Sequence, residues 1–242
     1  MSMTLESFCA ETGIGARPIG VYDAPDPELF APLVRLRRCI FDHYEDWQRG
    51  ETLVIDGASQ GCPGSGYWLT GVGRFPSREV MVNFLTDREG LRETSALTEA
   101  WLDARPVSHP VHGHILIGPV RENMAQYLKT VTFFVTPDQL SVLSFGANYR
   151  AHPDDPEPVL APCGSGCGQM FSLFPSLDKA QAIIGAVDIA MRIHLPPDLL
   201  AFTVTPPMLE RLLSLDDGHS FLGKPFLQKM RSARAAASGE PL

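Results

Sequence analysis

Two apolar runs near the middle of the chain constrain the fold most strongly. They read HILIGPV (114–120) and TVTFFVT (130–136), and β-branched and aromatic residues dominate both. Residues of these types favour the buried strands of a sheet. Strands are also predicted in, or at the start of, four other stretches: ARPIGVYD (16–23), TLVID (52–56), AQAIIGAVDIAMR (180–192) and LAFTVT (200–205). A sheet is therefore expected to run through the protein.

Helical patterns lie between the strand candidates. In residues 29–48 the apolar side chains recur at steps of three, four and seven, which predicts one amphipathic helix that ends at Gly50. The alternation of strands and helices is irregular, and no internal repeat is evident. The sequence therefore predicts a mixed α/β (α+β) fold, a single compact domain over residues 1–242 with a mixed sheet and flanking helices, whose tail (236–242) frays. The other expected helices are two within 77–105, interrupted near Gly90, then 137–149, 206–215 and 221–236, the last interrupted near Pro225.

The charge balance argues against two classes of partner. The 242 residues carry a formal net charge of −8, and lysine and arginine form no run within the body of the chain. Nucleic acids and anionic membranes bind clustered positive charge, so neither is expected as a partner. The first residues, MSMTLESFCAETGIG, lack the basic start and apolar core of a signal peptide, and no apolar stretch is long enough to span a membrane. A cytoplasmic location is expected.

The cysteines are the most informative residues for function. There are five, an odd number, and cytoplasmic thiols stay reduced unless they bind metal or take part in redox chemistry. Cys62 lies in GCPGSG, whereas Cys163 and Cys167 lie in CGSGCG. Glycine allows backbone N–H groups to approach a thiolate and stabilise its charge. The sequence therefore predicts a cofactor site at these turns, with four glycines placed to contact the bound group: Gly61, Gly64, Gly166 and Gly168.

The two remaining cysteines differ in their surroundings. Cys39 lies within the expected first helix, where His43 follows four residues later and shares its face, whereas Cys9 beside Phe8 is expected to pack or to lie on a frayed surface. Thiolates in glycine-rich settings hold iron–sulfur clusters, and Cys39 could join the others around one cluster. Packing as a small hydrophobic residue is the simpler alternative for Cys39. A structural zinc site has weak support, because C-x3-C is not the spacing of zinc knuckles.

Several segments, in the right order, carry a resemblance to a known family. They are RPIGVY (17–22), RGETLVIDGASQGCPGSGYWLTG (49–71) after Cys39, TFFVTPDQLSVLSFGANY (132–149), APCGSGCGQM (161–170), IIGAVDIAMR (183–192), LAFTVTPPML (200–209) and SFL (220–222). Together they extend over nearly the whole chain. On these segments the protein resembles the domain of unknown function 169 family, the uncharacterised ArCR family.

The resemblance bears mainly on the cysteines. The family pattern places cysteines at the positions of Cys39, Cys62 and Cys167, which implies that these three meet in space. The chain departs from the pattern at Ser65, where a second glycine is common, and at Cys163, which many members lack. Cys163 is therefore either a fourth ligand or a bystander. The resemblance implies no established reaction.

Two other segments offer candidate chemistry. In VHGH, His112 and His114 would lie on one side of a short strand, near His109, which suits either metal binding or a polar strand entrance. In GAVDIAMR, Asp188 and Arg192 are four residues apart. They either form an ion pair on a helix, or Arg192 faces an anionic ligand or a cluster.

Three hypotheses of function follow from these residues. The leading one is an iron–sulfur protein, with a 4Fe–4S cluster as the expected form, bound by Cys39, Cys62 and Cys167 with Cys163 as a candidate fourth ligand. It would act in a redox or small-molecule transformation, with a small-molecule ligand or a redox partner. The first alternative is a metal-free module that binds a small molecule through the amides of its glycine-rich turns. The second is a thiol-based redox protein that pairs Cys62 with Cys163 or Cys167.

Overall fold

The computed structural model describes residues 3–56, 77–104, 111–155, 157–161, 164, 166–171, 173, 176–216 and 221–238. Its elements follow one another in this order: α1 (Leu5–Thr12), β1 (Ile19–Tyr22), η1 (Pro27–Phe30), β2 (Leu33–Arg35), η2 (Ile40–His43), α2 (Tyr44–Arg49), β3 (Thr52–Asp56), α4 (Arg78–Asn83), η3 (Phe84–Arg88), α5 (Ser95–Asp103), β4 (His114–Pro119), η4 (Glu122–Tyr127), β5 (Leu128–Val135), α6 (Pro137–Asn148), β6 (Val159–Leu160), α7 (Gly166–Phe171), β7 (Ala182–Gly185), η6 (Ile189–His194), β8 (Leu200–Val204), α8 (Pro206–Leu213), η7 (Ser214–Asp216), η8 (Phe221–Gly223) and α9 (Pro225–Ser238).

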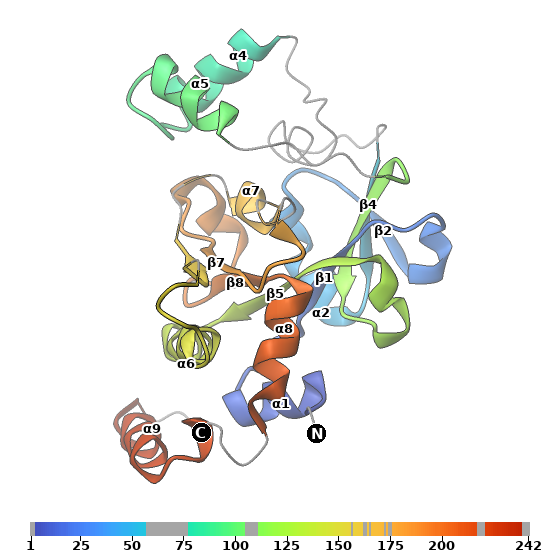
Figure 1. The fold of residues 1–242 in the computed structure, drawn as a ribbon. Coiled ribbons are helices and arrows are strands. Elements are labelled where there is room, and N and C mark those ends of the chain that lie inside the picture. The colour runs from blue at the N-terminus through green and yellow to red at the C-terminus, as the bar shows by residue number, and fades with distance from the viewer. Residues whose placement is uncertain are drawn as a thin grey trace.

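The described strands form one mixed sheet of eight strands, in the order β2-β3-β4-β1-β5-β8-β7-β6. The outermost pairs, β2–β3 and β6–β7, are parallel, and every other neighbouring pair is antiparallel. Helices flank this sheet, so the predicted mixed α/β fold is confirmed (Figure 1). The six strands expected from sequence are the six central ones.

The two halves of the sheet share one topology. Outward from the centre, one half runs β1, β4, β3, β2 and the other runs β5, β8, β7, β6, with the same pairing directions. The central β1–β5 pair is antiparallel, as an approximate two-fold axis through the sheet requires. In each half a helical segment connects the two parallel edge strands: η2 and α2 in the first, α7 in the second. The sequence showed no such repeat.

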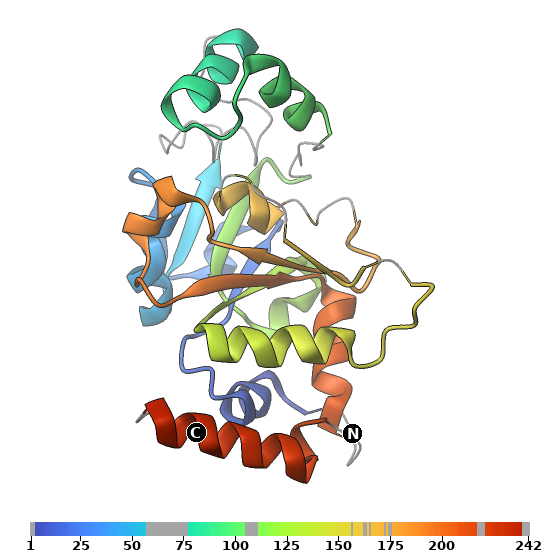
Figure 2. The ribbon, with the colours of Figure 1, turned by 90° about the vertical axis from the view of Figure 1, so that its left-hand side faces the viewer.

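Each face of the sheet carries its own core. Ile55, Ile117, Phe134 and Ala201 face one side, called here the cysteine face, where they pack with residues of η2, α2, α4, α5, α7 and η6. The opposite face packs against α1, α6 and α8. Figures 1 and 2 both show α7 and α6 on opposite sides of β7 and β8. A residue's face therefore decides which helices it can meet.

The helix expected over residues 29–48 was wrong in its first half. The chain forms η1, then β2, and becomes α-helical only in α2. Pro32 would disrupt the interior of the expected helix, and Leu33, Val34 and Arg35 instead pair in parallel with β3. The end of the helix was predicted correctly, because Gly50 caps α2 with a left-handed φ of 100°.

Gly118 allows β4 to pass close to the start of β3. A Cβ atom added at Gly118 would lie 2.5 Å from Oγ1 and 3.0 Å from Cα of the buried Thr52. Because backbone cannot move aside as a flexible side chain can, we expect Gly118→Ala to lower the free energy of unfolding by about 2 kcal/mol, measured by urea denaturation. Gly15→Ala is the control, since no atom lies within 4 Å of its added Cβ. Equal stability of the two variants would contradict this packing.

Candidate functional site

Cys39 lies where the chain enters η2, not in the middle of a helix as expected. It is the N-cap residue of η2, with extended backbone angles (φ −84°, ψ 146°), and it is partly buried. Its backbone N–H donates to Oδ2 of Asp42 over 3.2 Å. The side chain packs against the core of the cysteine face.

Cys167 occupies the corresponding place in the other half of the fold. It is the second residue of α7 and is buried, next to Met170 of the same helix. Cys39 and Cys167 thus lie in the two segments that join parallel edge strands, and both belong to the hydrophobic core of the cysteine face. The structure therefore brings together two of the cysteines that the sequence predicted to meet.

Four aromatic rings fix η2 and α2 on the sheet. Phe134 of β5 is fully buried and contacts Phe41, Tyr44 and Trp47. The Trp47 ring stacks on it at a centroid distance of 6.1 Å, and the other two rings meet it edge-on. The segment that carries Cys39 and Asp42 therefore depends on one side chain at the centre of the sheet.

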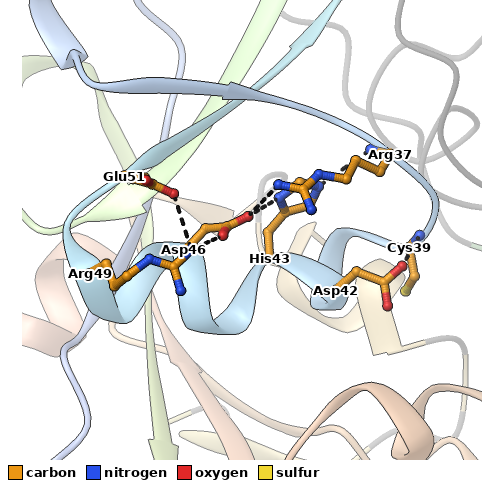
Figure 3. A network of polar contacts seen from close by, with 7 residues as sticks. All are labelled: Arg37, Cys39, Asp42, His43, Asp46, Arg49 and Glu51. Atoms are coloured by element: carbon orange, nitrogen blue, oxygen red, sulfur yellow. Dashed lines mark hydrogen bonds and ion pairs between the residues drawn. The ribbon is translucent and has the colours of Figure 1, made fainter.

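A buried polar network reinforces the same segment (Figure 3). Nδ1 of the fully buried His43 donates to Oδ2 of Asp46 over 2.6 Å, and its Nε2 accepts the backbone N–H of Arg37 at 3.4 Å. Arg49 donates to the other oxygen of Asp46, and the guanidinium of Arg37 lies 3.7 Å from Oδ2. Both ring nitrogens of His43 are therefore engaged, and His43 does not serve as a partner of Cys39.

The protonation of Asp46 follows from these contacts. Burial raises the pKa of its carboxyl group, but the interactions with His43 and the charges of Arg37 and Arg49 outweigh burial and lower the pKa overall. The carboxylate is therefore ionised wherever the protein is folded near neutral pH. This network is structural, since it ties the end of β2 to α2.

A second carboxylate–histidine pair lies at the junction of η2 and η6, and the sequence analysis missed it. Nδ1 of His194 donates to Oδ1 of Asp42 over 2.6 Å, across 152 positions of sequence. Both side chains are partly exposed, at 24% and 31%. Asp42 thus bonds His194 with one oxygen and the backbone of Cys39 with the other. His194 stands two residues beyond the segment that the family resemblance singled out, which is the one signal that pointed near it.

Arg192 braces η6 from within. Its guanidinium donates to the backbone carbonyls of Ala186, Pro196, Pro197 and Leu199. These four bonds give Arg192 a structural role, and a contact with an anionic ligand stays a prediction. Asp188, its candidate ion-pair partner, caps the first turn of η6 by accepting the N–H of Ala190.

Gln169 connects α7 to the start of the η6 segment. Its Oε1 accepts the N–H of the buried Ala186 at 3.1 Å. Ala186 has a φ of 60°, a left-handed conformation that is uncommon outside glycine. The side chain two residues after Cys167 therefore holds in place the backbone that leads to His194.

The remaining predicted site residues divide into two groups. Gly166 opens α7 and Gly168 is buried within it. The other four lie outside the described residues: Gly61, Cys62, Gly64 and Cys163. Among the residues that the structure describes, no three side chains of histidine, cysteine, aspartate or glutamate come together as a site for one metal ion.

The predicted histidine segment forms the entrance to β4. The backbone N–H groups of Val111 and His112 donate to the two carboxylate oxygens of Asp23, at 2.8 and 3.1 Å. Gly113 follows with a φ of 77°, and His114 opens the strand, paired with Asp56 of β3. His109 lies outside the described residues. The described part of this segment is thus a turn leading into a strand.

Cys9 lies apart from the other described cysteines. It is on α1 and packs against the core of the opposite face of the sheet. Burial raises the pKa of its thiol to about 11, so this thiol stays protonated near neutral pH. It is a suitable internal control for experiments on the cysteine face.

Comparisons with known proteins give a family but no described activity. In the part of the chain that the structure describes, no helix has the length and apolar character to cross a membrane. No curated protein and no solved structure matched the chain. The family model for domain of unknown function 169, described as uncharacterised ArCR, matches residues 12–214. That span contains both halves of the sheet and ends before α9, so the chain belongs to this uncharacterised ArCR family.

Proposed function

We propose that this protein binds an iron–sulfur cluster on the cysteine face and uses it in a redox or small-molecule transformation. The proposed ligands are Cys39, Cys62 and Cys167. One observation carries the proposal: Cys39 and Cys167, far apart in sequence, pack into one core from equivalent segments of the two halves. Cys62 enters from the sequence prediction alone.

Thiolate chemistry favours a cluster over a single ion at this place. Cysteine thiolates are the usual ligands of iron–sulfur clusters. A single ion draws its ligands to one point, whereas in a cluster each iron takes its own protein ligand. Ligands contributed by two separate segments, one from each half of the fold, suit the second arrangement.

The number of protein ligands would decide the kind of reaction. Three cysteines leave one iron open to a small molecule, as open coordination positions do in catalytic metal sites. Four protein ligands would suit electron transfer. In either case η2 and α7 would hold the thiolates, and the apolar core around them would limit the access of water.

The proposal predicts the cysteines on which iron depends. Protein expressed and purified without oxygen should contain iron and inorganic sulfide in equal amounts, with an EPR signal on reduction. Cys39→Ser, Cys62→Ser and Cys167→Ser should each lose most of both elements, because serine oxygen is a poorer ligand for such clusters. Cys9→Ser is the matched control and should keep both, since Cys9 packs on the opposite face.

The decisive contrary result is also clear. Colourless wild-type protein without iron, from cells with competent cluster assembly, would overturn the proposal. Equal iron contents in the wild-type protein and all three variants on the cysteine face would do the same.

A further inference from the structure

We propose that His194 is the non-thiolate ligand of the cysteine site, binding through Nε2. This inference rests on the proposed function and deepens it, because it names a fourth protein ligand. The sequence offered Cys163 for that role. The described contacts point instead to the histidine that Asp42 joins to Cys39.

The first observation is the shared carboxylate. Asp42 accepts from Nδ1 of His194 at 2.6 Å and from the backbone N–H of Cys39 at 3.2 Å. One carboxyl group thus separates the histidine ring from the residue that carries the proposed thiolate. Metal-binding histidines almost always donate their second ring N–H to a carboxylate, a carbonyl or a water, which orients the ring and makes the other nitrogen more basic.

The second observation is the state of Nε2. Among the described residues, Nε2 of His194 has no hydrogen-bond partner, and the side chain is 24% exposed. The other buried carboxylate–histidine pair supplies a comparison within the same segment. There Nε2 of His43 accepts from Arg37, and the ring is fully buried. His43 is satisfied by the protein, whereas His194 presents a lone pair outward.

The third observation is the rigidity of the support. Arg192, two residues before His194, binds four backbone carbonyls around η6, and Gln169 of α7 holds Ala186 at the start of the same segment. A ligand position needs a supporting shell of this kind to hold its geometry. The helix that carries Cys167 and the segment that carries His194 are therefore mechanically connected.

A histidine ligand has a chemical consequence. Imidazole is a neutral donor, and exchange of thiolate for histidine raises the reduction potential of an iron–sulfur centre. The iron bound by His194 would also be held at the partly exposed junction of η2 and η6. This site would serve electron transfer to a partner, because its ligand set is complete.

The test uses full-length protein purified without oxygen, in which histidine alone carries nitrogen-15. Pulsed EPR of the reduced protein should detect a strongly coupled nitrogen-15 nucleus. His194→Ala should abolish that coupling, and His194→Cys should restore iron content without it. Asp42→Asn should weaken iron retention by about 10-fold against a chelator, as loss of a supporting carboxylate does at other metal sites. His152→Ala is the control, since that histidine is exposed beside Asp154.

The outcomes separate the two proposals. A strong coupling that disappears in His194→Ala and persists in Cys163→Ser supports the assignment. A cluster without histidine coupling, whose iron content falls in Cys163→Ser, overturns it and leaves the iron–sulfur proposal standing. Wild-type protein without a cluster overturns both.

Discussion

Phe134→Ala is expected to lower the free energy of unfolding by about 3–5 kcal/mol, the largest effect of any single apolar truncation on the cysteine face. The ring is 1% exposed and contacts Phe41, Tyr44 and Trp47, so its removal leaves a cavity beneath η2 and α2. Those two elements carry Cys39 and Asp42. Urea denaturation followed by circular dichroism measures the loss.

Phe226→Ala provides the matched control for this substitution. Phe226 lies on α9 and is 69% exposed, so its truncation should change stability by no more than about 0.5 kcal/mol. Phe134→Leu should recover part of the loss, because it refills some of the cavity. A Phe134→Ala protein as stable as the Phe226→Ala protein would show that the rings do not pack as described.

Asp46→Asn is expected to destabilise the protein by about 3 kcal/mol at neutral pH, since it removes one partner of a buried charged network. His43, Arg37 and Arg49 would lose the carboxylate that they share. The pKa of Asp46 is lowered in the folded protein, so its stabilising effect is present above the pKa of an unfolded aspartate and is lost as pH falls through the folded value. Wild-type stability should therefore decline below about pH 4, and this component should be absent from Asp46→Asn.

Asp154→Asn is the control for the acid dependence. Its side chain is 92% exposed and lies 3.4 Å from His152, so it forms the same type of pair in solvent. Exposed pairs contribute little, and this variant should follow the wild-type protein at every pH. Chemical denaturation between pH 3 and 7 compares the three proteins. Parallel curves for Asp46→Asn and the wild type would remove Asp46 from the acid response.

The strands illustrate how far local sequence carries a prediction. The six predicted strands form the centre of the sheet, and their apolar side chains make them recognisable without knowledge of their neighbours. The two strands that the sequence missed, β2 and β6, are the two edges, with three and two residues. Such short segments become strands only because a parallel neighbour pairs with them. Residues 29–48 were taken for one helix because the pairing with β3 cannot be seen from within the segment.

The candidate site divides in the same way. Glycine-flanked cysteines and a family pattern pointed to Cys39 and Cys167 before the fold was known, and both lie in the core of the cysteine face. The pair of Asp42 and His194 could not be predicted, because neither residue has a distinctive neighbourhood in the sequence. They became partners through the packing of η2 against η6.

The sequence by itself determined which segments are apolar enough to form the central strands, where helices such as α2 and α6 end or begin, and which thiols merit attention. These properties depend on residues within a few positions of one another. Only the tertiary structure decided the two-fold topology of the sheet, the edge strands, the shared face of Cys39 and Cys167, and the joining of His194 to Asp42. Each of these is a contact between distant segments, and its energy exists only once the chain has closed the loops between them.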